Sequence, residues 1–268
     1  MTAISHAPSN IVLRQSSSRT ARAFIPPMLV AVVVVFAWAV AAHISESAVF
    51  PGPAEALRSL WQDLQRPRFL ESIGSTTRVF VLAYLAAVAV GAVAGMTLGL
   101  SAFWSSAVLP IVYAVNSIPK ITLYPIFLLF LGIGDLGRGS FAFVSGVLPM
   151  FLIAVEATAA VNRLHLKMAA SLQMGWLSLL RRIVIPSVLP ALVSGMRLTF
   201  GLTFIGLLLA EMFSSSSGLG SELLHNVTLV RMGNILGEVV LIAVLALLPT
   251  LLLGLLERRV QRRFGAEV

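Results

Sequence analysis

The chain has 268 residues, of which 58% are hydrophobic and 11% are charged, and its formal net charge is +8. A soluble domain carries about 25% charged residues, and a folded chain of this size keeps too much surface in water for so apolar a composition. Composition therefore excludes a water-soluble protein, and the absence of cysteine excludes disulfides, thiolate metal sites and cysteine nucleophiles.

Six apolar runs approach or exceed the length of about 20 residues that a helix needs to cross a bilayer. They cover residues 24–44, 79–100, 108–131, 140–161, 187–212 and 235–256. The first run begins at Pro26 and Pro27, is too long for a signal-peptide core and has no cleavage site, so we read it as a retained span. We expect an all-α, polytopic fold of six transmembrane helices, with a membrane domain over 24–258 between tails 1–23 and 259–268.

Lysine and arginine are unevenly distributed among the segments that flank these runs. Most of them lie in the N-terminal tail, in the loop 162–186 and in the C-terminal tail. Basic residues favour the cytoplasmic side of a membrane. We therefore expect a multi-pass protein of a bacterial inner membrane with both termini in the cytoplasm, and we attribute the positive charge to topology rather than to nucleic-acid binding.

After the first span, residues 50–71 form an extracytoplasmic segment with helical periodicity. Its apolar positions recur between Pro53 and Pro67, and include Leu57, Leu60 and Trp61. An amphipathic helix on the membrane surface fits this pattern, and so does a lid that packs on the helix bundle.

The second span carries Gly91, Gly95 and Gly99 at a spacing of four residues. Glycines at this spacing let two helices approach closely. We expect a helix-packing face there, with a contact to a second permease as one candidate, and not a phosphate-binding loop.

The third span contains Pro119 and Pro125, which predict a broken helix that lines protein or water rather than lipid. Lys120 lies beside the break, where an unpaired charge costs at least ~2.5–3.5 kcal/mol. Its compensation could be an anionic substrate, an ion pair with Glu156, or access to a membrane interface. The candidate pathway residues are Ser117, Pro119, Lys120, Tyr124, Glu156, Arg197 and Glu211.

The fourth and fifth spans are joined by the loop 162–186, which is basic and also unusually apolar. A short helix of this composition could dock by its apolar face into a groove on a partner, or could fold back on the bundle ends. The small residues Ala169, Ala170 and Ser171 would permit a close approach and favour a partner.

This loop resembles the cytoplasmic signature of binding-protein-dependent ABC importers, Glu-Ala-Ala, then Gly, then Ile-x-Leu-Pro. Ala169, Ile183 and Pro186 match it, whereas Lys167 and Gln173 stand where the usual acid and glycine are. Four segments in order are similar to permeases of the nitrate/sulfonate/taurine importers over most of residues 50–258. They are FPGP at 50–53, SIPKITLYPIFLLFLGIGDLGR at 117–138, RRIVIPSVLPALVSGMRLTFG at 181–201 and IGLLLAEMFSSSSGLG at 205–220.

The resemblance implies a bundle like that of type I ABC importer permeases, which transports a small anion such as taurine, another sulfonate or nitrate. It also implies three kinds of partner: two ATPase subunits that carry ATP and Mg²⁺, a second permease copy or paralogue, and an extracytoplasmic solute-binding protein. The residues of the coupling loop would be Leu166, Lys167, Met168, Ala169, Ala170, Ser171, Gln173, Gly175, Arg181, Arg182 and Pro186.

The sequence contains no phosphate-binding G-x-x-x-x-G-K-[ST] motif and no cluster of its four histidines, so we expect no cofactor or metal on this chain and no catalysis by it. There are three alternative functions, and the sequence disfavours the last two. A secondary transporter would use buried acids such as Glu156, Glu211 and Glu238, an intramembrane enzyme would need paired catalytic groups, and a scaffold would not need Lys120.

Overall fold

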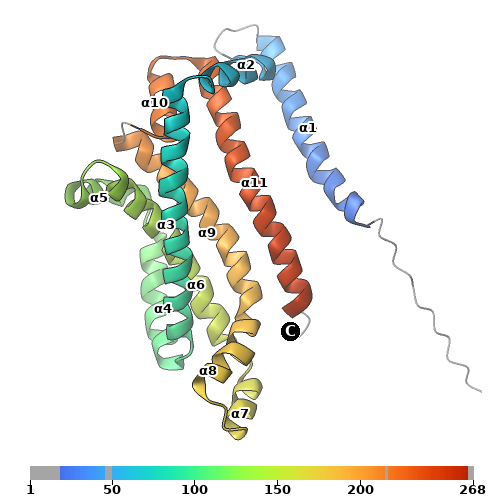
Figure 1. Ribbon diagram of the computed structural model, residues 1–268, viewed down its shortest axis with the longest axis vertical. Helices are drawn as coiled ribbons and strands as arrows, with labels where there is room; N and C mark the ends of the chain where they lie inside the picture. Colours follow the sequence, from blue (N-terminus) through green and yellow to red (C-terminus); the bar gives the residue numbers. More distant parts are fainter. Residues whose placement is uncertain (1–18, 46–49, 215–216, 265–268) are drawn as a thin grey trace, which may run out of the picture. The chain divides into compact units, whose positions relative to one another are not determined.

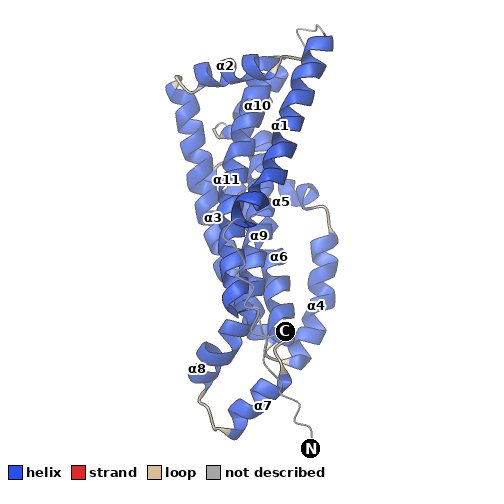
Figure 2. Cartoon of the chain, turned by 90° about the vertical axis from the view of Figure 1, so that its right-hand side faces the viewer, coloured by secondary structure: helices blue, strands red, loops and turns tan. Residues whose placement is uncertain are grey.

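The computed structural model describes residues 19–45, 50–214 and 217–264, and these contain helices and turns but no strand (Figure 2). The chain divides into two units, residues 1–54 and 55–268. The all-α prediction is confirmed for the described residues.

The first unit contains α1 (Arg19–Ser45), which covers the predicted first span. This helix starts before residue 24, so Pro26 and Pro27 lie within it rather than at its first position. From Leu29 onward its large apolar side chains are mostly exposed, as expected of a helix in lipid. The indole nitrogen of Trp38 donates to the carbonyl of Pro51 at 3.2 Å and ties the end of α1 to the following turn.

The second unit is a bundle of long apolar helices. Four of its helices are long and apolar enough to cross a membrane, and a fifth candidate is a bent pair. The four are α3 (Pro67–Gly99), α6 (Asp135–Ala159), α9 (Ile185–Ser214, which continues the helix begun at Trp176) and α11 (Met232–Phe264). Together with α1 and the bent pair, they place helical segments on all six predicted apolar runs.

The glycines of α3 pack within the chain. A β-carbon on Gly91, Gly95 or Gly99 would lie 2.6–2.8 Å from side chains of α6, which is closer than packed carbons approach. These glycines therefore let α3 and α6 come together within one chain. The alternative of a contact to a second permease is not needed to explain them.

The predicted third span, 108–131, is not one helix. The chain forms α4 (Ala102–Ser117), a short 3₁₀ turn η1 (Lys120–Leu123) and α5 (Tyr124–Leu131), and it bends by 84° between the two halves. Pro119 lies at the bend as predicted. Pro125 does not interrupt a helix, because it occupies the first turn of α5, where a missing N–H has no cost.

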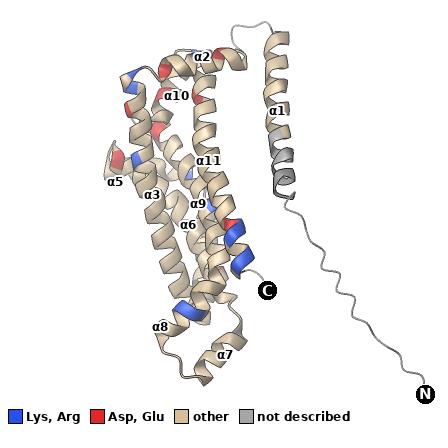
Figure 3. Cartoon of the chain, turned by 45° about the vertical axis from the view of Figure 1, so that its right-hand side comes forward, with Lys and Arg blue, Asp and Glu red and all other residues tan. Residues whose placement is uncertain are grey.

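Short helices lie at the two ends of this unit (Figure 1). At one end lie α2 (Pro53–Asp63) and α10 (Leu219–Thr228), and at the other lie α7 (Arg163–Ser171) and α8 (Trp176–Leu179). Most Lys, Arg, Asp and Glu side chains lie toward these ends (Figure 3), as the low dielectric of a bilayer requires.

The predicted segment 50–71 contains two helices, because Pro67 starts α3 after a short turn. Within α2, Ala56 and Asp63 are buried, and Leu60 packs against Gly237 of α11. This favours the lid alternative over a helix that only lies on the membrane. Leu57 and Trp61 are exposed on the remaining face.

Candidate functional site

Lys120 lies at the bend between α4 and α5 and is half-buried. Its ammonium nitrogen donates to the side-chain oxygen of Asn116 at 3.0 Å. Glu156 is not its partner: that side chain is exposed near the far end of α6, about 15 residues and so roughly 22 Å along the helix from Phe141, on which α5 packs. A neutral amide therefore holds the ammonium group at the bend.

Tyr124 fixes the start of α5. Its side chain is 2% exposed, its ring lies 4.9 Å from that of Phe141, and its hydroxyl donates to the carbonyl of Ala210 at 3.0 Å. Ser117, at the end of α4, is exposed and its hydroxyl donates to a carbonyl of its own helix. The second half of the broken helix is thus anchored to α9, directly before Glu211.

Glu211 forms the centre of a buried polar cluster with Arg138 and Thr76, which we call the Arg138–Glu211 cluster. The Arg138 guanidinium donates to Glu211 at 3.0 Å, and the Thr76 hydroxyl donates to the same carboxylate at 2.9 Å. The backbone N–H of Gly220 donates to it at 3.1 Å, so Glu211 also caps the start of α10. One carboxylate therefore connects four helices: α3, α6, α9 and α10.

The guanidinium of Arg138 has further partners at the edge of the cluster. It donates to the carbonyl of Ser217 at 2.7 Å, to the hydroxyl of Ser75 at 2.6 Å and to Asp135 at 2.5 Å. Asp135 also pairs with the exposed Arg78. Glu211 is among the candidate pathway residues selected from the sequence, whereas Arg138, whose side chain is only 1% exposed, is not.

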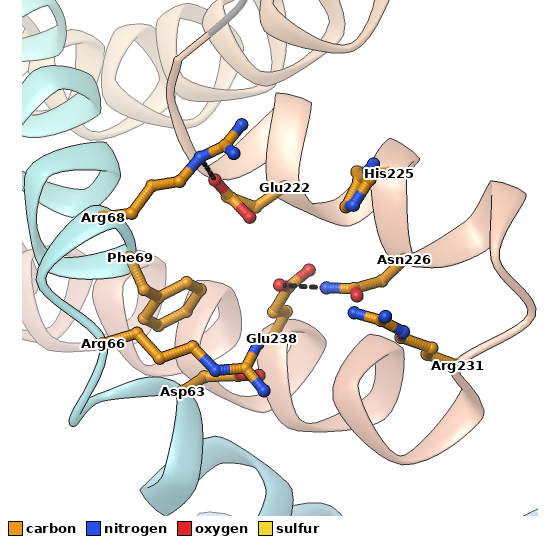
Figure 4. Close-up of a pocket in the computed structure, with 9 residues that line it drawn as sticks. All are labelled: Asp63, Arg66, Arg68, Phe69, Glu222, His225, Asn226, Arg231 and Glu238. Carbon is orange, nitrogen blue, oxygen red and sulfur yellow. Dashed lines mark hydrogen bonds and ion pairs between the residues drawn. The ribbon is translucent and has the colours of Figure 1, made fainter.

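A small cavity of about 120 Å³ lies between α3, α10 and α11, beside the end of α2 (Figure 4). Its charged lining is balanced, with three acids and three arginines: Asp63, Glu222, Glu238, Arg66, Arg68 and Arg231. Glu238 accepts from Asn226 at 2.7 Å, and Asn234 donates to Asp63 at 2.8 Å.

Arg197 does not lie in the bundle interior as the sequence suggested. Its side chain is 50% exposed, and its guanidinium lies 3.6 Å from the Glu257 carboxylate of α11. The structure thus separates three charged groups that were grouped by sequence: Lys120 at the bend, Glu211 in its cluster, and Arg197 beside α11.

The loop 162–186 forms a helical hairpin of α7, a turn and α8, hereafter the α7–α8 hairpin. Its apolar side chains divide into two sets. Leu166, Leu179 and Leu180 pack against the core of α6 and α9. An outward set is more than half exposed and consists of Leu164, Met168, Leu172, Trp176 and Leu177. The fold-back alternative therefore holds for the inward set, and docking of the outward set on a partner stays a prediction.

The turn after α7 is a Schellman motif. The N–H groups of Gln173 and Met174 donate to the carbonyls of Ala170 and Ala169, both at 3.0 Å. Gln173 has φ of +50°, the left-handed conformation that glycine adopts most easily. Glycine is therefore usual at this position of the signature because it adopts this backbone conformation without strain. Gln173 adopts the same conformation at a cost in free energy.

Within the hairpin, Ala169 is 3% exposed, so its small side chain serves packing inside the chain, whereas Ala170, Lys167 and Ser171 are exposed. Beyond Gly175 the backbone widens into a π-helical turn over Leu180–Val184. Pro186 follows this turn, and its ring would clash with the carbonyl of Arg182 in a regular helix. The wider turn avoids that clash and leaves Arg181 and Arg182 exposed.

Comparison with known proteins identifies relatives of this arrangement. The family model described as the binding-protein-dependent transport system inner membrane component matches residues 87–265. The taurine transport system permease protein TauC of Escherichia coli K12 is 26% identical over 75% of this chain and 70% of its own length. A putative aliphatic sulfonates transport permease protein, SsuC of Bacillus subtilis 168, is 22% identical over 66% of this chain and 64% of its own length. The nitrate import permease protein NrtB of Synechococcus elongatus is 22% identical over 74% of each chain.

Proposed function

Since the chain belongs to the family of binding-protein-dependent transport system inner membrane components, we propose that it forms the pathway by which a small anion crosses the membrane. The chain is the permease subunit of an ABC importer. The relatives named for taurine, sulfonates and nitrate support an anionic substrate of that size for this chain as well.

The observation that supports the pathway is the 84° break beside Lys120. A helix interrupted in the membrane leaves carbonyl and N–H groups that lipid cannot satisfy, so it has to face protein or water. Among the described residues, the hydrogen-bond partner of Lys120 is a neutral amide, and a passing anion would supply a compensating negative charge. Ser117, Pro119 and Tyr124 shape the same bend and complete the proposed pathway at this point.

Coupling to ATP is proposed for the α7–α8 hairpin. Its outward apolar set is left uncovered by the described residues of this chain, and apolar surface of this kind fits a groove on another protein. The partners are two ATPase subunits that bind ATP and Mg²⁺, and a second permease copy or paralogue completes the membrane part. The chain itself contributes no catalytic group, the hairpin and both termini face the cytoplasm, and the binding protein docks at the end that carries α2 and α10.

Uptake by proteoliposomes tests this function directly. The chain is reconstituted with its ATPase and binding protein, and uptake of taurine, an alkylsulfonate and nitrate is measured with and without ATP. We expect uptake of at least one anion that requires both ATP and the binding protein. Lys120→Met should reduce uptake, and Lys120→Arg, which keeps the charge, should retain more of it.

An ion-coupled transporter is the second candidate, and buried acids are the observation that favours it. Glu211 is already paired with Arg138, whereas Glu238, in α11, has a buried oxygen without a hydrogen-bond partner among the described residues. Uptake by the chain alone, driven by an ion gradient without ATPase subunits, would select this function and overturn the importer.

A further inference from the structure

A groove runs along the outer side of α9 where it meets α11. Four consecutive positions on one helix face form its apolar wall: Leu198, Gly201, Leu202 and Ile205. The polar groups that line the same groove are Ser194, Arg197, Thr250 and the acid Glu257. Its volume is about 460 Å³, roughly three times that of a 150 Å³ cavity that holds a benzene ring. The groove is long enough and apolar enough for part of an acyl chain.

The wall of the groove is open at Gly201. A β-carbon built on this glycine meets no atom within 4 Å, whereas one on Gly195 or Gly206 of the same helix meets atoms at 3.1 Å or 2.6 Å. Those two glycines serve packing between helices, and Gly201 does not. An apolar helix face without protein neighbours in a membrane protein is occupied by lipid or by another chain.

The charge of Arg197 indicates which lipid fits. Its side chain is half exposed, and in the part of the chain that is described its guanidinium has a single ionic partner, Glu257, at 3.6 Å. Glu257 is itself bound by the hydroxyl of Ser194 at 2.6 Å and by the amide of Gln261 at 3.3 Å, so its charge is shared. A guanidinium has five N–H donors, and most of those of Arg197 remain available for a second anion.

The arginines at the end of α11 also favour an anionic headgroup beside Arg197. Directly after Glu257, α11 carries Arg258, Arg259, Arg262 and Arg263 in its last turns. Glu257 follows the apolar run 235–256, so Arg197 and these arginines lie at the level where the hydrocarbon ends and lipid headgroups begin. Basic pockets between transmembrane helices at that level bind anionic headgroups.

We propose that the groove between α9 and α11 binds an anionic phospholipid. The phosphate pairs with the guanidinium of Arg197, and one acyl chain lies along Leu198, Gly201, Leu202 and Ile205. The site is separate from the bend at Lys120 and does not depend on which solute is transported. Such a lipid would compensate the half-exposed charge of Arg197, which lipid tails alone would destabilise.

Native mass spectrometry of the purified transport complex tests the proposal, with phosphatidylglycerol and phosphatidylcholine of identical acyl chains as the probes. We expect the wild-type complex to retain more phosphatidylglycerol. Arg197→Gln should remove this preference, which for one basic residue amounts to about fivefold, since each contributes about 1 kcal/mol. Glu257→Gln should act in the opposite direction and raise retention, because it removes the competing carboxylate.

A separate variant tests the part of the site that would hold the acyl chain. Gly201→Leu places an apolar side chain in the groove, where a β-carbon meets no atom within 4 Å. It should lower retention of both lipids by about tenfold, the loss of roughly two buried methylene groups. Gly74→Leu is the matched control, because a β-carbon on Gly74 of α3 also meets nothing within 4 Å but lies outside the groove. It should leave retention unchanged.

Three results would overturn the proposal. Equal retention of the two lipids by the wild type would show that no anionic headgroup is selected. Unchanged retention in Gly201→Leu would show that no chain lies in the groove. Loss of subunit assembly in Gly201→Leu, with lipid retention intact, would show that another polypeptide segment occupies it.

Discussion

The Arg138 guanidinium lies 3.0 Å from the Glu211 carboxylate, and the two side chains are 1% and 0% exposed. Opposite charges buried in this way stabilise each other only as a pair, since either one alone would remain desolvated without compensation. Thr76 and Gly220 bind the same carboxylate, so the pair determines how α3 and α10 meet α6 and α9. This polar contact therefore joins α10 to the bundle in addition to the apolar packing.

Removal of one partner should be strongly destabilising. Arg138→Met leaves the Glu211 charge buried, and we expect a loss of about 3–5 kcal/mol, measured as a large drop in thermal stability of the purified protein in detergent. Arg78→Met is the control, because it breaks an ion pair to Asp135 whose side chains are 68% and 47% exposed. Exposed pairs contribute about 0–1 kcal/mol, so equal effects of the two variants would contradict this account.

The close approach of α3 and α6 should not tolerate a side chain at Gly95. A β-carbon there would lie 2.6 Å from both the Ala154 side chain and the Phe151 carbonyl. We expect Gly95→Val to cost about 1–3 kcal/mol or more by overpacking, seen as lower yield and lower melting temperature. Gly74→Val places the same side chain on the same helix where no atom lies within 4 Å, and it should have little effect.

A strained residue ends α10. Val230 has φ of +55°, a conformation that β-branched residues rarely adopt, and its side chain is 64% exposed. Val230→Asn should therefore raise the melting temperature by the equivalent of about 1 kcal/mol. A lower melting temperature would mean that the apolar side chain makes a contact that outweighs its backbone strain.

The hairpin turn offers a similar test at its departure from the family signature. Gln173→Gly restores a residue suited to φ of +50° and should slow hydrogen exchange of the Met174 amide, which bonds to the Ala169 carbonyl. Gln173→Val should accelerate that exchange. Identical exchange in both variants would show that the left-handed conformation imposes no cost here.

Sequence periodicity located the helices well because a membrane span is specified by a local run of apolar residues. The predicted helix ends were less accurate. The third span was predicted as one helix but is divided in the structure, because the direction of α5 depends on a contact from Tyr124 to Ala210, 86 residues away. No local pattern contains that information. The break itself was predictable, since Pro119 marks it in the sequence.

The polar sites, too, could be predicted only in part from local sequence. Arg138 reads as a loop charge, because its partner Glu211 lies 73 residues further along the chain. Arg197 was predicted to lie on the pathway, because sequence alone does not show which face of a helix is covered by other helices. The α7–α8 hairpin was recognisable from its composition, but only the structure separates Leu166, which packs inward, from Leu172, which is 73% exposed.

The amount of ABC ATPase that co-purifies with the permease tests the central claim most directly. Leu172→Asp places a charge in the outward apolar set of the hairpin, where burial against a partner would cost about 2 kcal/mol or more. We predict at least a tenfold loss of co-purified ATPase from this variant, and none from Val230→Asp, which places the same charge on the opposite end of the bundle. Wild-type amounts of ATPase together with normal ATP-driven uptake in Leu172→Asp would contradict the assignment of the hairpin as the coupling element.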